Sequence, residues 1–172
     1  MVTCRIWTCL ALFSMWCSGS PTVFLLIFTM KSPMRLATSV SGRSMKRSIR
    51  GTGALTMPEI AELVQRALLR FDGERYSLLA WCVMPNHVHA LIESRPMHRL
   101  DRVVHSWKSF TAHAANKLLG RTTAFWAPEY FDRYMRDDMH FAATLAYIET
   151  TPVKAGLCRE PREWAFSSAS RR

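Results

Sequence analysis

Residues 76–89 are the feature that most constrains what this chain can fold into. An apolar stretch from Tyr76 to Val83 is followed by Met-Pro-Asn and then by two histidines, His87 and His89, one residue apart. Such a stretch is typical of a buried β-strand. Because side chains alternate along a strand, both imidazoles would point to the same face. The segment therefore predicts a rigid strand carrying a pair of candidate metal ligands, although a His-x-His pair alone more often binds no metal.

Length and charge set the wider limits. The 172 residues fit one domain, and an apolar content of 49% suffices for a buried core. The net charge of +10 is unevenly placed, because residues 1–58 hold seven Lys or Arg and no acids, whereas residues 59–172 hold sixteen against thirteen. Residues 95–136 are locally basic, and we expect phosphate contacts there. On charge alone, a solvated charged surface is an equal alternative.

Cysteine usage points to a reducing compartment. The five cysteines, at positions 4, 9, 17, 82 and 158, form no Cys-x-x-Cys pair and no even set. We expect no disulfide framework, a small core residue at Cys82, and a cytoplasmic location.

Residues 1–51 differ from the rest of the chain. Their two apolar runs, Ile6–Trp16 and Thr22–Met30, fall short of the about 18–20 apolar residues that span a bilayer. One interpretation is a weak secretory signal, and the other is an out-of-frame or poorly ordered segment. The run Thr22–Met30 also has the composition of a first strand. We place the functional domain in residues 52–172 and assign no function to the segment before it.

From Thr56 onward, the sequence alternates between helical and strand patterns. Thr56 and Glu59 have capping-box spacing, and apolar residues at intervals of three and four predict a helix up to Phe71. A second helix is expected over 100–119, with Gly120 as its stop. Its expected inward residues are Val103, Val104, Trp107, Phe110, Ala114 and Leu118.

A short strand over 130–135 and a third helix over 138–150, closed by Pro152, complete the pattern. Helices interleaved with a few strands predict an α+β sandwich, a sheet with helices packed on one face.

The third helix carries a tyrosine beside a hydroxyl. Phe141, Leu145 and Ile148 form a narrow apolar stripe that should face the core. Tyr147 and Thr151 lie on its flank and, being four residues apart, are neighbours. A tyrosine nucleophile and an oxygen ligand would thus reach one metal-bound phosphate together. Taken alone, a flanking tyrosine is more commonly a boundary residue of an amphipathic helix.

Several ordered motifs together resemble the single-tyrosine HUH transposases of bacterial insertion sequences, and among them the REP-associated tyrosine transposases. The matching text is Val83-Met84-Pro85-Asn86-His87-Val88-His89, Ser106-Trp107-Lys108-Ser109-Phe110-Thr111-Ala112, Phe125-Trp126, 129–137, Tyr147-Ile148-Glu149 with Pro152-Val153-Lys154-Ala155-Gly156-Leu157, and finally Trp164 and Ser167-Ser168-Ala169. The similarity covers about residues 52–170.

The resemblance implies a ferredoxin-like α+β core with an antiparallel sheet, and it implies DNA strand cleavage. Such enzymes cut and rejoin hairpin-flanked single-stranded DNA through a 5′-phosphotyrosine, with Mg²⁺ or Mn²⁺ and no ATP. By motif position, Tyr147 is the nucleophile, and His87 and His89 are the metal pair. The resemblance also implies a monomer or homodimer in the cytoplasm, associated with the nucleoid and without stable membrane association. The expected DNA contacts are Lys108, Arg121, Arg133, Arg136 and Lys154.

Two departures from the family pattern leave an alternative open. Thr151 stands where the family usually has Asn or Gln as the third metal ligand, and a hydroxyl is the poorer ligand for a hard cation. We therefore expect weaker metal binding, or a water in that place. The family's first strand is not recognisable in residues 1–51, and its loss would leave an unpaired sheet edge. The alternative is a decayed, sequence-specific DNA-binding protein; a metal-binding membrane or export protein is favoured only by the first thirty residues.

Overall fold

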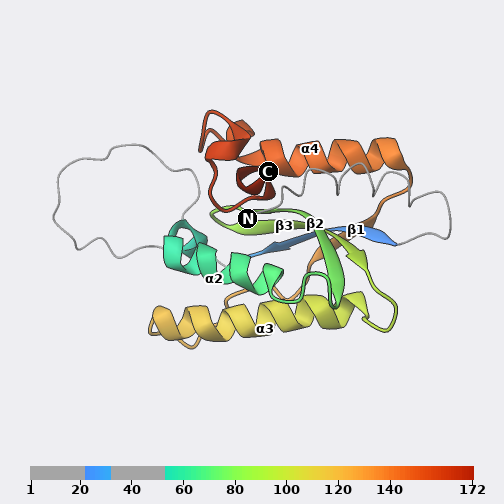
Figure 1. Cartoon of the computed structure of the whole chain (residues 1–172). Coiled ribbons are helices and arrows are strands. Elements are labelled where there is room, and N and C mark those ends of the chain that lie inside the picture. The colour runs from blue at the N-terminus through green and yellow to red at the C-terminus, as the bar shows by residue number, and fades with distance from the viewer. Residues whose placement is uncertain (1–21, 32–52) are drawn as a thin grey trace, which may run out of the picture.

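The computed structural model describes residues 22–31 and 53–172, with a four-stranded antiparallel sheet at the centre (Figure 1). Its strands are β1 (Val23–Thr29), β2 (Tyr76–Val83), β3 (His87–Ser94) and β4 (Phe131–Tyr134). The α-helices are α2 (Pro58–Leu69), α3 (Leu100–Leu118) and α4 (Asp138–Lys154), and the 3-10 helices are η1 (Ala54–Thr56), η2 (Pro161–Glu163) and η3 (Ser168–Arg171). Among the helices of the described ranges, none is long and apolar enough to cross a membrane.

The strand order β2-β3-β1-β4 gives the sheet a ferredoxin-like topology. Helix α2 connects β1 to β2, and α3 connects β3 to β4, so that each helix joins two strands separated by one other strand. The predicted α+β class and antiparallel sheet are confirmed.

The helices cover both faces of the sheet, which corrects the expectation that they lie on one face. Helices α2 and α3 cover one face and α4 covers the other (Figure 1). Along β1, Leu26 belongs to the core under α2 and α3, whereas Leu25 belongs to the core under α4. Because both faces of the central strands are apolar, each face needs its own cover.

Strand β1 lies inside the sheet, between β3 and β4. It pairs antiparallel with both neighbours, so the strand predicted over Thr22–Met30 is confirmed. The boundary at residue 52 therefore excludes a strand that belongs to the sheet. Because β1 is present, the unpaired edge expected from a missing first strand does not arise. The other predictions for residues 1–51, including the run Ile6–Trp16, lie outside the described residues.

Two predicted helix ends differ from the structure. The capping box at Thr56 does not form, because Thr56 belongs to η1 and its Oγ1 donates to the Gly53 carbonyl at 2.7 Å, while α2 starts at Pro58. Helix α4 passes through Pro152 and ends at Lys154. Its stop is Gly156, which has φ +70.

The ends of α3 and α4 share one mechanism. At the end of α4, Gly156 donates to Val153 and Leu157 donates to Pro152, both at 2.9 Å, which is the Schellman pattern. The predicted stop at Gly120 is confirmed, since its φ of +61 ends α3 in the same way.

The buried face of α3 is rotated from the predicted one. Val103, Val104 and Trp107 are buried as expected, but Phe110 and Leu118 are exposed. Thr111 is buried instead, because its Oγ1 donates to the Trp107 carbonyl at 2.6 Å and accepts from Trp126 Nε1 at 2.8 Å. These two partners satisfy the buried hydroxyl.

Candidate metal and nucleophile site

The two histidines at the start of β3 face α4 and bring their ring nitrogens together. The Nε2 atoms of His87 and His89 are 2.9 Å apart, and their rings are 83° from coplanar. Two imidazole ligands held about 2.1 Å from one ion at about a right angle would be about 3.0 Å apart. The pair therefore fits adjacent positions around a divalent ion.

Burial keeps both imidazoles neutral. It lowers the pKa of His87, and burial followed by the neighbouring His87 lowers the pKa of His89 to about 4. Neutral rings keep the lone pairs that metal binding needs. The lowered pKa values favour the uncharged forms of both rings, which are the forms that bind an ion.

Asn86 orients the first ring. Its Oδ1 accepts a 2.7 Å hydrogen bond from His87 Nδ1, which leaves the lone pair on Nε2, the atom that faces His89. The second ring has no such support, since His89 Nδ1 is buried and lacks a hydrogen-bond partner among the described residues.

The other ligands of an ion bound at His87 and His89 would come from groups other than these two side chains. Within residues 22–31 and 53–172, no group of three or more His, Cys, Asp or Glu is placed to hold an ion. Mg²⁺ commonly keeps several waters and binds through a few protein ligands and a substrate phosphate. The residues present therefore fit Mg²⁺ or Mn²⁺ completed by water and phosphate oxygens.

The turn before the histidines is packed on a glycine. Met84 donates to the His87 carbonyl at 2.8 Å, and Met30 donates to the Asn86 carbonyl at 3.0 Å. At Gly53, a Cβ would collide with the Pro85 carbonyl oxygen and lie 3.1 Å from Asn86 Cα. Glycine therefore permits the close backbone approach that fixes this turn.

Helix α4 places Tyr147 on the histidine pair. The apolar stripe of Phe141, Leu145 and Ile148 packs against the sheet as predicted, and Tyr147 lies on its flank. The Tyr147 ring stands at 90° to the His89 ring with 5.6 Å between centroids, and the side chain is 45% exposed. The phenol is thus beside the histidine pair and open to a ligand.

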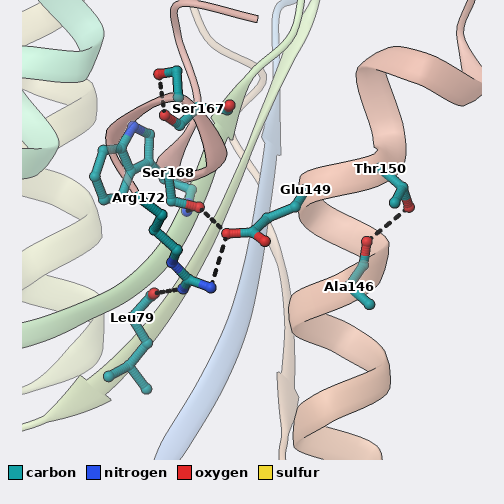
Figure 2. A network of polar contacts seen from close by, with 9 residues as sticks. Leu79, Ala146, Glu149, Thr150, Ser167, Ser168 and Arg172 are labelled. Carbon is teal, nitrogen blue, oxygen red and sulfur yellow. Dashed lines mark hydrogen bonds and ion pairs between the residues drawn. The ribbon is translucent and has the colours of Figure 1, made fainter. Parts of the chain in front are cut away.

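Thr151, the predicted third ligand, uses its proton inside the helix. Its Oγ1 donates to the Tyr147 carbonyl at 2.6 Å. The neighbouring Thr150 makes the same kind of bond, from its Oγ1 to the Ala146 carbonyl at 2.7 Å, which Figure 2 shows. Only the lone pairs of the Thr151 oxygen are left for an ion, and its role as a ligand stays a prediction.

The C-terminal segment fastens α4 to β2. Glu149 Oε1 accepts from Ser168 Oγ at 3.0 Å and pairs with Arg172 at 3.2 Å (Figure 2). Arg172 also donates to the Leu79 carbonyl at 3.2 Å, and Ser168 Oγ accepts from the Trp81 amide at 3.3 Å. Glu149, two residues after Tyr147, therefore anchors α4 to the C-terminal segment and, through Ser168 and Arg172, to β2.

The structure brings two of the five predicted DNA-contact residues near the site. Lys154 Nζ lies 5.3 Å from the Tyr147 ring centre, and Arg133 on β4 is on the same face of the sheet as the histidines. Arg136 is exposed in the connection between β4 and α4.

The other two belong to the layer on the far side of the sheet. Lys108 Nζ donates to the carbonyls of Ala127 at 2.6 Å and Pro128 at 2.9 Å, and Arg121 Nε donates to Asn116 at 3.0 Å. Both cations support the connection between α3 and β4, and their DNA contacts stay predictions.

Strand β1 supplies neighbours that the sequence pattern did not reveal. Thr29 stands opposite His87 and Ile27 opposite His89 in the β1–β3 ladder. Their strand composition was recognisable, but the register that places them at the histidines joins segments about sixty residues apart.

Comparison with known proteins gives one family match and two similar proteins. Residues 55–151 match the family described as Transposase IS200 like. A putative REP-associated tyrosine transposase of Haemophilus influenzae is 26% identical over 106 residues, which are 56% of this chain and 60% of the relative. A REP-associated tyrosine transposase of Escherichia coli is 25% identical over 115 residues, 64% and 65% of the two chains. The chain thus spans less than two thirds of the length of these relatives.

A solved structure has a similar fold. It is a REP-associated tyrosine transposase bound to a REP hairpin, with a TM-score of 0.66 and 17% identity, and the match covers 89% of this chain and 79% of that one. The likeness supports the ferredoxin-like α+β architecture described above.

Proposed function

The chain belongs to the IS200-like transposase family, and we propose from its site that it cuts and rejoins hairpin-flanked single-stranded DNA through Tyr147. The observation that carries this proposal is the perpendicular contact between the Tyr147 ring and His89, which joins a candidate nucleophile to a candidate metal pair. The solved relative was bound to a hairpin, and we extend to this chain only that class of ligand.

The proposed step is a phosphoryl transfer to tyrosine. The Tyr147 oxygen forms a bond to the phosphorus of a DNA phosphodiester, and the bond from phosphorus to the 3′ oxygen breaks. The phenol proton passes to water, the 3′ oxygen takes up a proton, and the 5′ phosphate stays on Tyr147. Rejoining is the reverse step, in which the 3′ oxygen bonds to phosphorus and the bond from phosphorus to Tyr147 breaks. It needs no ATP, because one phosphate ester bond is exchanged for another.

The surrounding side chains have defined parts in this step. A divalent ion at His87 and His89, Mg²⁺ or Mn²⁺, would polarise the phosphate and offset charge on the leaving oxygen. Lys154 brings a second positive charge to the phenol, which assists a weak nucleophile. Asn86 keeps the His87 lone pair directed toward the site.

The alternative function is DNA binding without cleavage. It is favoured by Thr151, whose hydroxyl is not an amide and whose proton is already donated within α4. Such a protein would keep the fold and the DNA surface but lose the covalent step.

A gel assay separates the two functions. The probes are single-stranded oligonucleotides that carry a hairpin and unpaired flanks, with sequences from both sides of the gene, incubated with Mn²⁺. Cleavage predicts a covalent protein–DNA adduct that is absent in Tyr147→Phe. Binding without an adduct would support the decayed form and refute cleavage.

The proposal also covers the location and oligomeric state of the protein. Because the proposed substrate is DNA, we place the protein at the nucleoid in the cytoplasm. We propose that it is a monomer or a homodimer. Light scattering with and without the hairpin probe decides between these two states.

A further inference from the structure

Helix α4 leaves part of the site face uncovered. The strand ladders align Cys82, His89, Ile27 and Phe131 in one row across all four strands. Helix α4 packs toward the β2 end of this row, where Cys82 is buried, whereas Phe131 on the edge strand β4 is 49% exposed. Within residues 22–31 and 53–172, the part of this face that no helix covers is therefore on the β1–β4 side of the histidines.

An arginine accompanies the exposed ring. Arg133 lies on the same face one row further along β4, with its guanidinium carbon 5.7 Å from the centre of the Phe131 ring. Thr29, also exposed, is opposite His87 at the near end of this surface. We call Thr29, Ile27, Phe131 and Arg133 the sheet shelf.

The sheet shelf lies within reach of a nucleotide next to the site. Neighbouring strands are about 4.8 Å apart, so the backbone of Phe131, two strands from β3, is about 10 Å from that of His89. A DNA strand whose phosphate is at the histidines would place an adjoining base over this surface.

The chemistry of the shelf fits a nucleobase better than a second copy of the chain. Aromatic faces stack on any base, and nearby cations contact the backbone phosphates. A second copy paired along the edge of β4 would bring the arginines at 133 and 136 of both copies together, and like charges oppose such pairing.

We propose that Phe131 stacks on a nucleobase adjoining the phosphate held at His87 and His89, and that Arg133 contacts the phosphate of that nucleotide. The inference rests on the proposed function and adds a binding subsite to it. Because every base has a stacking face, the subsite strengthens binding without selecting sequence.

The test measures binding of the hairpin oligonucleotides by fluorescence anisotropy with Mn²⁺ present. All proteins compared, including the one called wild type at position 131, carry Tyr147→Phe so that the phosphate can be held but not cut. Phe131→Ala and Phe131→Leu should each weaken binding about tenfold, within the range expected for one stacked base. Phe131→Trp should bind like the wild type.

Tyr134→Ala is the matched control. Tyr134 is on the same strand and is 45% exposed, but it contacts Phe24 on the opposite face. Tyr134→Ala should leave the affinity for the hairpin oligonucleotides unchanged. Thermal unfolding of every variant confirms that it folds.

Abasic sites scanned along the oligonucleotide locate the stacked base. At one position beside the cleaved phosphate, an abasic site should weaken binding to wild type but not to Phe131→Ala. Equal affinities of Phe131→Ala and Tyr134→Ala, or equal abasic losses in wild type and Phe131→Ala, would overturn the subsite. If the chain with Tyr147 intact still forms the adduct with Mn²⁺, only the subsite is wrong; an intact chain that neither binds nor reacts refutes the function as well.

Discussion

The ring of Tyr147 on α4 stands perpendicular to the ring of His89 on β3, with 5.6 Å between centroids. This contact joins two segments about sixty residues apart at the one end of the sheet where the histidine nitrogens converge. The geometry of the Tyr147–His89 contact depends on the turn that orients His87 and on the packing of α4 against β2. Each of these supports can be removed separately.

Asn86→Ala should weaken Mn²⁺ binding about 10- to 100-fold, the usual effect of losing the partner that orients a metal-binding histidine. The reason is the 2.7 Å bond from His87 Nδ1 to Asn86 Oδ1, which fixes the tautomer. Calorimetric titration with Mn²⁺ measures the affinity. Asn86→Asp keeps an acceptor and should stay within a few-fold of wild type; equal loss in both variants would contradict the orienting role.

Thr151→Asn should strengthen Mn²⁺ binding and increase covalent adduct, because an amide carbonyl is the better oxygen ligand. Thr150→Asn is the matched control, since Thr150 is the next residue and its hydroxyl makes the same hydrogen bond within α4. An equal gain in both variants, or none at position 151, would show that the missing amide does not limit the site.

Glu149→Gln should lower the free energy of unfolding by about 1–3 kcal/mol, the range for disturbing a hydrogen-bonded charge. The Glu149 carboxylate is mostly buried and holds both Ser168 and Arg172. Urea unfolding measures the loss. Glu62→Gln is the matched control, because the Glu62–Arg66 pair is exposed and 3.8 Å long, and its loss should cost under about 0.5 kcal/mol. Equal effects would mean that the contacts of Glu149 do not hold α4.

Local patterns predicted the parts of the site that depend on one segment. Alternation along residues 76–89 placed both histidines on one face, and the helical stripe placed Tyr147 on its flank. The register did not follow from the sequence, because the row from His89 to Phe131 combines β3, β1 and β4. Long-range pairing of this kind is set by the burial of both sheet faces, which also explains why α4 lies opposite α2 and α3.

The ends of helices show the same limit on a smaller scale. Pro152 suggested a stop, because proline lacks an amide donor and its ring crowds the carbonyl four residues earlier. Helix α4 nevertheless continues to Lys154 and ends before Gly156, whose positive φ completes the Schellman bonds. Gly156, at a turn position that needs glycine, therefore indicates the end of α4 better than Pro152 does.

Stability should fall at high pH through Tyr76. Burial raises the pKa of Tyr76 to about 12 from 10.0, and its hydroxyl donates to the Leu68 carbonyl at 2.6 Å. Because the folded pKa is above the unfolded one, this contribution is complete below pH 10 and is lost as pH rises through 12. The full loss is about 3 kcal/mol, from a shift of about two pKa units.

Urea unfolding from pH 8 to 11.5 measures this loss, with Tyr76→Phe as the control. The variant lacks the titrating hydroxyl, so its stability should fall less steeply above pH 10 than that of the wild type. Parallel curves would mean that Tyr76 titrates alike in the folded and unfolded chains.

Gly53→Ala should loosen the histidine turn without touching either imidazole. The added Cβ would collide with the Pro85 carbonyl oxygen and crowd Asn86 Cα at 3.1 Å, so the turn must shift. We expect a loss of about 1–3 kcal/mol in stability, as for other overpacked sites, together with weaker Mn²⁺ binding. Ala54→Gly is the matched control: it removes a buried methyl from the next residue, and so loses stability, but it pushes nothing toward Pro85. Mn²⁺ titration of the two folded variants decides the point, because only the first should lose affinity if the close approach at Gly53 sets the position of His87.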